Sequence, residues 1–296
     1  MFLPDQMKIK QAITKILAIL QLIRPVNILV IALTTFFGIA YHTEIIHWNI
    51  VIPTVLVPVF IAAGGFAIND FFDLQIDKAN KISRPLVTGK LSINLVYGFS
   101  ICAFIIGIIC TIFIKNIEMI LLAGLNAILL YYYAKSWKKI ALLGNFIVSF
   151  ACACTFMFGA FANSNLKNVW IISILAFFYT FIRELVKDAE DIEGDRKYNA
   201  KTLPIIIGNR RTIIFSIILC IPIFFFSYLG FHLKLYDLFI FLAIIMFILF
   251  SMYLLLHLII IDSNKKDFHR VQRLMKLNIL LSLIILWIGQ WGHINI

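Results

Sequence analysis

Two groups of three aspartates share one spacing, an interval of three residues followed by an interval of four. The groups are Asp70, Asp73 and Asp77, and Asp188, Asp191 and Asp195. On a helix, residues at these intervals lie on one face. Both groups follow long apolar stretches, where a carboxylate must reach water or bind a cation. Since three like charges on one face repel one another, the pattern indicates two sites for positive charge.

The surroundings of both groups indicate magnesium and phosphate chemistry. Neither stretch contains His or Cys, so the available donors are oxygen atoms, which Mg²⁺ prefers. In proteins, Mg²⁺ commonly takes one or two carboxylates together with substrate phosphates. Basic residues that could hold phosphate oxygens lie nearby, and these are Arg84, Lys90, Lys135, Arg183, Lys187 and Lys201. The combination suits a diphosphate, whereas each group taken alone could also be a solvated acidic loop.

Long apolar segments must position these residues. The chain is 62% hydrophobic and 14% charged, and it contains 28 Phe. Several segments reach the roughly 20 apolar residues that span a bilayer. We therefore predict an all-α membrane protein with one domain over residues 1–296, in which residues 1–25 form an amphipathic cytoplasmic segment. The nine predicted spans are residues 26–41, 51–70, 93–114, 117–134, 140–162, 169–187, 212–231, 237–261 and 274–291.

The distribution of Lys and Arg predicts the orientation in the membrane. With the N-terminus in the cytoplasm, 22 of the 26 basic residues fall in cytoplasmic segments and three fall on the opposite side. This alternation follows the positive-inside rule. It accounts for the net charge of +11 without nucleic acid, for which the sequence has no binding motif. We expect both aspartate groups on the cytoplasmic face of the cell membrane and the C-terminus on the opposite side.

Two further polar positions have competing interpretations. Tyr131 and Lys135 lie on one face at the end of the fourth span, and they could belong to an interfacial aromatic belt or to the site. Asn27, near the start of the first span, could make a helix–helix hydrogen bond. The residues alone leave both questions open.

Four motifs together resemble those of the intramembrane prenyltransferases of the UbiA superfamily. They are Asn69-Asp70-x-x-Asp73-x-x-x-Asp77, Arg84-Pro85-x-x-x-Gly89, Tyr131-x-x-x-Lys135 and Asp188-x-x-Asp191-x-x-x-Asp195. The resemblance covers nearly the whole chain. It implies nine helices bundled around a central cavity, capped on the cytoplasmic side by the two motif loops and open sideways to lipid. It also implies Mg²⁺-dependent ionisation of an isoprenyl diphosphate, followed by attack of an acceptor on the allylic cation.

The resemblance also implies roles for individual residues. Asn69 and the six aspartates match the metal motifs of the family. Tyr131 would lie in the cavity near the reacting carbon, and Asn27 would face the cavity. The residues expected to hold substrate, most of them through the diphosphate, are Asn27, Asn69, Arg84, Lys135, Arg183, Lys187 and Lys201.

The acceptor is the least determined part of the prediction. The stretch 183–195, together with Lys201-Thr202-Leu203-Pro204, looks most like the branch that transfers a geranylgeranyl group to geranylgeranylglyceryl phosphate. The alternative is an aromatic acceptor in quinone or tocopherol-type biosynthesis, because branches with such acceptors share much of this pattern. A transporter or cation channel is the alternative outside enzymes. It would place acids deep within the spans, which contain almost none.

Overall fold

The fold is entirely helical in the part of the chain that the structure describes. This computed structural model describes residues 4–41, 43, 47–79, 82–163, 166–261 and 263–294. Over those residues the only β feature is one isolated bridge between Ile140 and Lys201, so the all-α prediction is confirmed. The chain packs as two compact units. Unit one comprises Met1–Leu33 and His47–Lys135, and unit two comprises Thr34–Ile46 and Ser136–Ile296.

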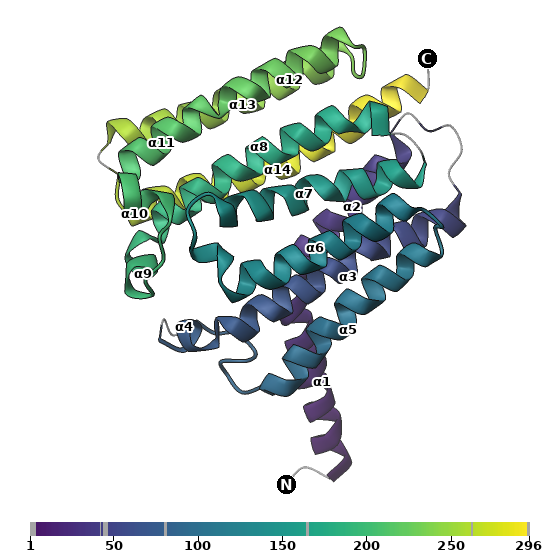
Figure 1. Cartoon of the computed structure of the whole chain (residues 1–296), viewed down its shortest axis with the longest axis vertical. Helices are drawn as coiled ribbons and strands as arrows, with labels where there is room; N and C mark the ends of the chain where they lie inside the picture. Colours follow the sequence, from purple (N-terminus) through teal and green to yellow (C-terminus); the bar gives the residue numbers. More distant parts are fainter. Residues whose placement is uncertain are drawn as a thin grey trace. The chain divides into compact units, whose positions relative to one another are not determined.

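Unit one is built around a single long helix, α3. Its helices are α1 (Pro4–Ile23), the first part of α2 (Pro25–Ala40), α3 (Trp48–Phe72), α4 (Leu74–Ala79), α5 (Ile93–Ile112) and α6 (Ile117–Lys135). Helix α3 packs against α1, α5 and α6 (Figure 1). At the α3–α5 contact, Ser100 Oγ donates a 2.8 Å hydrogen bond to the carbonyl oxygen of Gly64. A Cβ at Gly64 would lie only 2.8 Å from the Phe104 ring, so glycine permits this close approach.

The predicted amphipathic segment is helix α1, which meets α2 at Arg24 with a bend of 53°. Ala18 and Leu22 are buried in a cluster with residues of α3 and the loop after α4. Ile13 and Leu17 lie on the exposed side. The described part of this segment is therefore helical, and its exposed apolar side chains suit a membrane surface. The cytoplasmic location of this segment stays a prediction.

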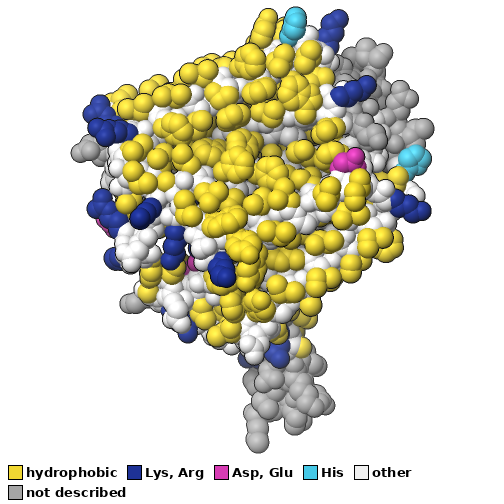
Figure 2. Space-filling model, in the orientation of Figure 1, with side chains coloured by type: hydrophobic (Ala, Val, Ile, Leu, Met, Phe, Trp, Pro, Cys, Tyr) yellow, Lys and Arg dark blue, Asp and Glu magenta, His cyan; other side chains and the backbone are white. Residues whose placement is uncertain are grey.

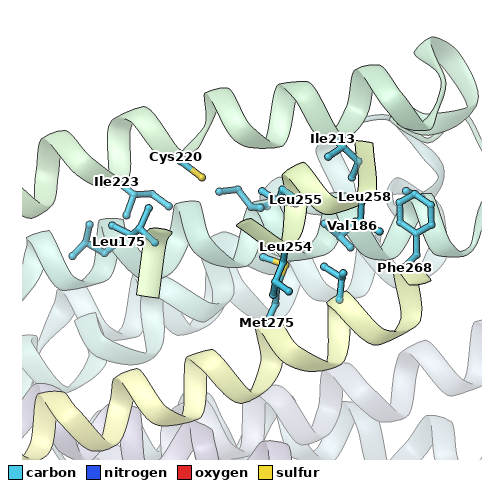
Figure 3. Close-up of a cluster of buried hydrophobic side chains, with 14 of the residues drawn as sticks. Leu175, Val186, Ile213, Cys220, Ile223, Leu254, Leu255, Leu258, Phe268 and Met275 are labelled. Carbon is cyan, nitrogen blue, oxygen red and sulfur yellow. The ribbon is translucent and has the colours of Figure 1, made fainter. Parts of the chain in front are cut away.

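Unit two is built around helix α8. Its helices are the second part of α2, the 3₁₀ helix η1 (Trp137–Lys139), α7 (Leu143–Ala162), α8 (Leu166–Glu190), α9 (Ile192–Lys197), α10 (Leu203–Ile207), α11 (Asn209–Ile218), α12 (Cys220–His232), α13 (Leu238–Ile260) and α14 (Lys265–Ile294). Helix α8 packs against α7, α11, α12 and α14. Figure 3 shows buried side chains from α8, α11, α12, α13 and α14 in one cluster, among them Val186, Leu255 and Met275.

Eight helices are long and apolar enough to cross a membrane, and the bent α1–α2 pair is a ninth candidate among the described residues. They occur where the nine spans are predicted, with α11 and α12 together forming the seventh. In Figure 2, hydrophobic side chains cover most of the visible surface of α11, α12 and α13. Ile221 and Phe225 of α12 and Met246 of α13 are among the exposed apolar residues. An apolar exterior of this extent fits contact with lipid.

Basic loops that the sequence assigns to one side of the membrane lie together in unit two. The backbone N–H of Lys201 donates to the Lys139 carbonyl at 2.7 Å, which joins the loops after α6 and α8. Near the end of α8, Glu190 Oε1 lies 2.7 Å from His269 Nδ1 at the start of α14. These contacts agree with the predicted alternation of loops. The direction of the chain in the membrane and the central cavity stay predictions.

Candidate functional site

The two aspartate groups have the same local backbone structure. Each group places one aspartate in the last turn of a long helix, one at the junction and one in a six-residue helix. The helical hydrogen bonding continues through both junctions: the Asp77 N–H donates to the Asp73 carbonyl at 2.8 Å, and the Asp195 N–H to the Asp191 carbonyl at 3.0 Å. The equal spacing in the sequence therefore produces equal local geometry.

In unit one, two arginines neutralise the aspartate group. Asp70 Oδ1 lies 2.9 Å from Arg24 Nη2 and 2.8 Å from Arg84 Nη1. The same Arg84 Nη1 lies 2.8 Å from Asp77 Oδ2. Asp70 and Asp77 are each only 3% exposed, and buried carboxylates are stable when they are paired in this way. Two of the three carboxylates therefore already have cationic partners.

The third carboxylate of unit one has an amide neighbour, and the Arg84 backbone is held by a turn. Asn69 Nδ2 donates a 2.8 Å hydrogen bond to Asp73 Oδ2.

The Thr88 N–H donates to the Arg84 carbonyl at 2.9 Å, and Gly89 follows with φ +72°, which glycine adopts without steric cost. Ser92 then caps α5 by accepting from the Leu95 N–H. Local residue types thus determine both the turn and the helix cap.

In unit two, the aspartate group lacks such cationic partners. Asp188 Oδ2 accepts a 2.8 Å hydrogen bond from Asn145 Nδ2 on α7. Among the described residues, none of Asp188, Asp191 and Asp195 forms an ion pair with Lys or Arg. Burial raises the pKa of the Asp191 and Asp195 carboxyls, and the nearby Lys187 ammonium offsets only part of the rise. This group therefore retains a demand for positive charge.

The basic residues of α8 are paired with a different acid. Arg183 Nη2 donates to Glu184 Oε1, and Lys187 Nζ lies 3.7 Å from Glu184 Oε2. Glu184 is 5% exposed, so its carboxylate depends on both cations. Arg183 and Lys187 are both predicted to hold phosphate. The structure brings them together, one residue before and three residues after Glu184.

The remaining predicted residues lie elsewhere in the two units. The Tyr131 ring lies 5.7 Å from the ring of Phe72, between Asp70 and Asp73 in the sequence. Asn27 is in the first turn of α2, and Lys135 ends α6 with an exposed side chain. Within the described ranges, neither Lys135 nor Lys201 forms an ion pair. The roles of these four residues stay predictions.

The donor atoms suit a hard divalent cation that is completed by substrate. Of the residues that the structure describes, no three His, Cys, Asp or Glu converge closely enough to hold a metal ion. Mg²⁺ does not require such a cage, because it retains several waters and combines one or two carboxylates with phosphate oxygens. Asp188, Asp191 and Asp195, which form no ion pair with Lys or Arg among the described residues, supply oxygen donors and negative charge. They therefore fit this mode of binding.

Three residues with site contacts were not predicted. They are Arg24, Asn145 and Glu184, and none of them is among the candidate site residues that the sequence indicates. Each is a polar residue in or beside an apolar span, and such residues commonly mark functional sites. That signal identifies candidates but not partners, since Asn145 and Asp188 are 43 residues apart.

Comparison with known proteins identifies the family. The sequence model of the UbiA prenyltransferase family matches residues 31–280. The digeranylgeranylglyceryl phosphate synthase of Sulfolobus acidocaldarius is 36% identical over 277 residues, which are 92% of this chain and 97% of that protein.

Solved structures agree with this assignment. One that concerns digeranylgeranylglyceryl phosphate synthase in membranes has a TM-score of 0.79 at 32% identity, covering 93% of this chain and 98% of that one. A UbiA homologue from Archaeoglobus fulgidus, bound to DMAPP and Mg²⁺, has a TM-score of 0.71 at 19% identity, covering 90% and 98% of the two chains. The chain therefore belongs to the UbiA prenyltransferase family, and it is an integral membrane prenyltransferase.

Proposed function

We propose that this protein transfers a geranylgeranyl group from geranylgeranyl diphosphate to the free hydroxyl of geranylgeranylglyceryl phosphate. The observation that carries the proposal is the arrangement at the end of α8. There, three carboxylates that form no ion pair with Lys or Arg among the described residues follow two partly exposed basic residues, Arg183 and Lys187. The end of α8 and the short helix α9 thus offer groups for a divalent cation and groups for phosphate. The relatives named digeranylgeranylglyceryl phosphate synthase support this choice of donor and acceptor.

In the reaction, the bond between C1 of the isoprenyl chain and the diphosphate oxygen breaks, and the diphosphate leaves with the bonding electrons. The acceptor hydroxyl then forms an ether bond to the allylic carbon and loses its proton. Arg84, Arg183 and Lys187 would bind the oxygens of the diphosphate and favour its departure. Tyr131 would face the reacting carbon, as the family resemblance implies.

We assign a divalent cation, Mg²⁺, to the aspartate groups. Asp188, Asp191 and Asp195 would hold a cation in unit two, and Asn69 and Asp73 would hold one in unit one. When bound, the cation supplies positive charge to the leaving diphosphate. Asp70 and Asp77 are also predicted metal residues, but their contacts are with arginines. The Archaeoglobus fulgidus homologue, solved with Mg²⁺, supports the choice of metal.

The environment of the reaction also suits a lipid substrate. An allylic cation reacts readily with water, so the site must exclude it. Membrane helices with apolar exteriors provide hydrocarbon on which an isoprenyl chain can lie. We propose that the aspartate groups are at the cytoplasmic face, where water-soluble Mg²⁺ and diphosphate are available. The support for this orientation is the distribution of Lys and Arg in the sequence.

The proposal is tested by transfer of labelled geranylgeranyl diphosphate in detergent or vesicles containing the purified protein and Mg²⁺. The acceptors offered separately are geranylgeranylglyceryl phosphate, the same lipid without phosphate, 4-hydroxybenzoate and homogentisate. We expect label only in the phosphorylated ether lipid, and none when EDTA replaces Mg²⁺.

Two variants provide the matched controls. Asp191→Asn should be inactive, and Glu193→Gln, which removes an exposed carboxylate of α9, should transfer at the wild-type rate. Label in an aromatic product alone would replace the proposed acceptor by the quinone-type alternative. Absence of transfer to every acceptor would refute the proposed reaction.

A further inference from the structure

Arg24 occupies an unusual position at the start of α2. It lies at the junction between α1 and α2 with φ +55°, a left-handed conformation that non-glycine residues seldom adopt. Its Nη2 is 2.9 Å from Asp70 Oδ1, and its guanidinium lies over the Phe66 ring at 4.8 Å from the centroid. These contacts to α3 fix the guanidinium in position and orientation.

Arg24 helps to neutralise the buried carboxylates, but this contact uses only part of its side chain. Arg84 already contacts both buried carboxylates, Asp70 and Asp77, through one nitrogen. Arg24 adds a second guanidinium to the same oxygen of Asp70. The two arginines balance the two buried carboxylates, and the contact with Asp70 occupies one nitrogen of Arg24. Asp70 thereby also holds the guanidinium in an orientation in which it can meet a further anion.

The Arg24 side chain has donors left for such an anion. A guanidinium carries five N–H donors, and Asp70 is the one hydrogen-bond partner of the Arg24 side chain among the residues described. The side chain is 35% exposed, whereas that of Asp70 is 4% exposed. One edge of the guanidinium is therefore anchored and the others are accessible. This is how arginine is presented where it binds phosphate in a fork.

The neighbouring groups favour an anion at the same place. Arg24 directly precedes α2, and its carbonyl oxygen accepts the N–H of Asn27 at 2.9 Å, so both residues belong to the first turn. A helix N-terminus attracts negative charge. Asn27 itself is a predicted substrate residue. Arg84 contacts the same oxygen of Asp70 that Arg24 contacts. Two arginines and a helix start thus gather around one buried carboxylate.

We propose that Arg24 binds a phosphate group of a substrate and that Asp70 is the residue that positions it. This inference rests on the proposed prenyl transfer, which supplies two phosphate-bearing substrates. The group is either the diphosphate of the isoprenyl donor or the phosphomonoester of the lipid acceptor. The test distinguishes these two sources.

The experiment measures phosphate binding by full-length protein in detergent, apart from turnover. Isothermal titration with inorganic pyrophosphate and Mg²⁺ reports the donor's headgroup, and titration with glycerol 1-phosphate reports the acceptor's. The variants are Arg24→Gln and Arg24→Lys, with Lys15→Gln on α1 as the control for loss of one exposed positive charge. The melting temperature of each variant is recorded in parallel.

We expect Arg24→Gln to bind one of the two probes about tenfold more weakly or worse, since a charge-assisted bidentate contact is lost. Arg24→Lys should recover only part of this affinity, because an ammonium cannot bind two oxygens in a fork. Phe66→Leu, which removes the ring under the guanidinium but no charge, should weaken the same probe by about threefold. Lys15→Gln should bind both probes like the wild type.

A double-variant cycle tests the role of Asp70. Asp70→Asn should weaken the same probe, and Asp70→Asn combined with Arg24→Gln should weaken it no further, because the two residues act as one unit. The inference is overturned if Arg24→Gln binds both probes within about twofold of the wild type, because the loss of a charged hydrogen bond weakens binding by more than this. Arg24 would then only join α1 and α2 to α3. The proposed function fails separately, if the wild-type protein transfers no prenyl group to any acceptor.

Discussion

The aspartate groups of the two units have the same spacing and the same local backbone but opposite charge balance. In unit one, Asp70 and Asp77 are buried against Arg24 and Arg84. In unit two, the corresponding Asp188 and Asp195 form no ion pair with Lys or Arg among the described residues. The comparison teaches that spacing within one element determines local shape. The partners that determine charge come from other elements.

This difference separates roles that the sequence assigned equally. Carboxylates that are already paired with guanidinium must lose those partners before a metal can bind, and breaking a buried ion pair is costly. Asp191 and Asp195 form no ion pair with Lys or Arg among the described residues, so a divalent cation can bind them without displacing a guanidinium. We therefore expect unit two to bind metal first and unit one to present arginines.

The largest effect should come from the junction aspartate of unit two. Asp191→Asn removes a charge that is expected to hold the metal, so prenyl transfer should fall by about a thousandfold or more. The assay with labelled diphosphate measures this loss. The melting temperature should stay close to the wild-type value, because no ion pair is broken. Transfer at the wild-type rate would show that the metal assignment is wrong.

Stability should distinguish the first aspartates of the two groups. Asp70→Asn leaves two guanidiniums without their shared carboxylate, and we expect a loss of about 2–4 kcal/mol in the free energy of unfolding. Asp188→Asn breaks no ion pair, so its loss should be below about 1 kcal/mol. Unfolding in detergent, followed by circular dichroism, measures both. Equal losses in the two variants would remove the distinction between the groups.

A smaller effect is expected at the amide that contacts Asp188. Asn145→Ala removes the 2.8 Å hydrogen bond to the carboxylate, and partners of this kind commonly change metal affinity about tenfold. The Mg²⁺ concentration giving half-maximal transfer should rise by this factor. As the control, Asn126→Ala removes a buried amide whose hydrogen bond, within the described part of the chain, is to Leu122 of the same helix α6, and it should leave the Mg²⁺ requirement unchanged. An unchanged Mg²⁺ requirement in Asn145→Ala would mean that Asp188 needs no orientation by α7.

The smallest effect is expected at the ion pair between α8 and α14. His269 is about half exposed and lies 2.7 Å from Glu190. His269→Gln should change the free energy of unfolding by less than about 0.5 kcal/mol, because exposed pairs contribute little. It should leave transfer unchanged, although Glu190 adjoins Asp191. A tenfold loss of transfer would mean that this contact positions the second aspartate group.

The sequence predicts the helices well because hydropathy and charge in a membrane act over long segments. The predicted spans 51–70 and 169–187 correspond to α3 and α8, whose ends carry the two aspartate groups. The turn at Arg84 and the cap at Ser92 were also predictable, since both depend on neighbouring residues.

The partners of the aspartates could not be predicted in this way. Arg24 and Asp70 are 46 residues apart, and Asn145 and Asp188 are 43 residues apart. Their pairing depends on which helices pack together and in which rotation about their axes. A single sequence shows polar residues in apolar spans but does not show which of them meet. The difference between the two groups is therefore visible only in the structure.

The most direct test measures metal binding in the absence of diphosphate. Purified protein in detergent is titrated with Mn²⁺, a divalent probe for the Mg²⁺ site, and free Mn²⁺ is followed by electron paramagnetic resonance. We predict that Asp191→Asn abolishes the tight site and that Asp70→Asn binds Mn²⁺ within about twofold of the wild type, because its carboxylate is engaged by arginines. Equal loss of Mn²⁺ binding in both variants would contradict the division of roles between the two aspartate groups.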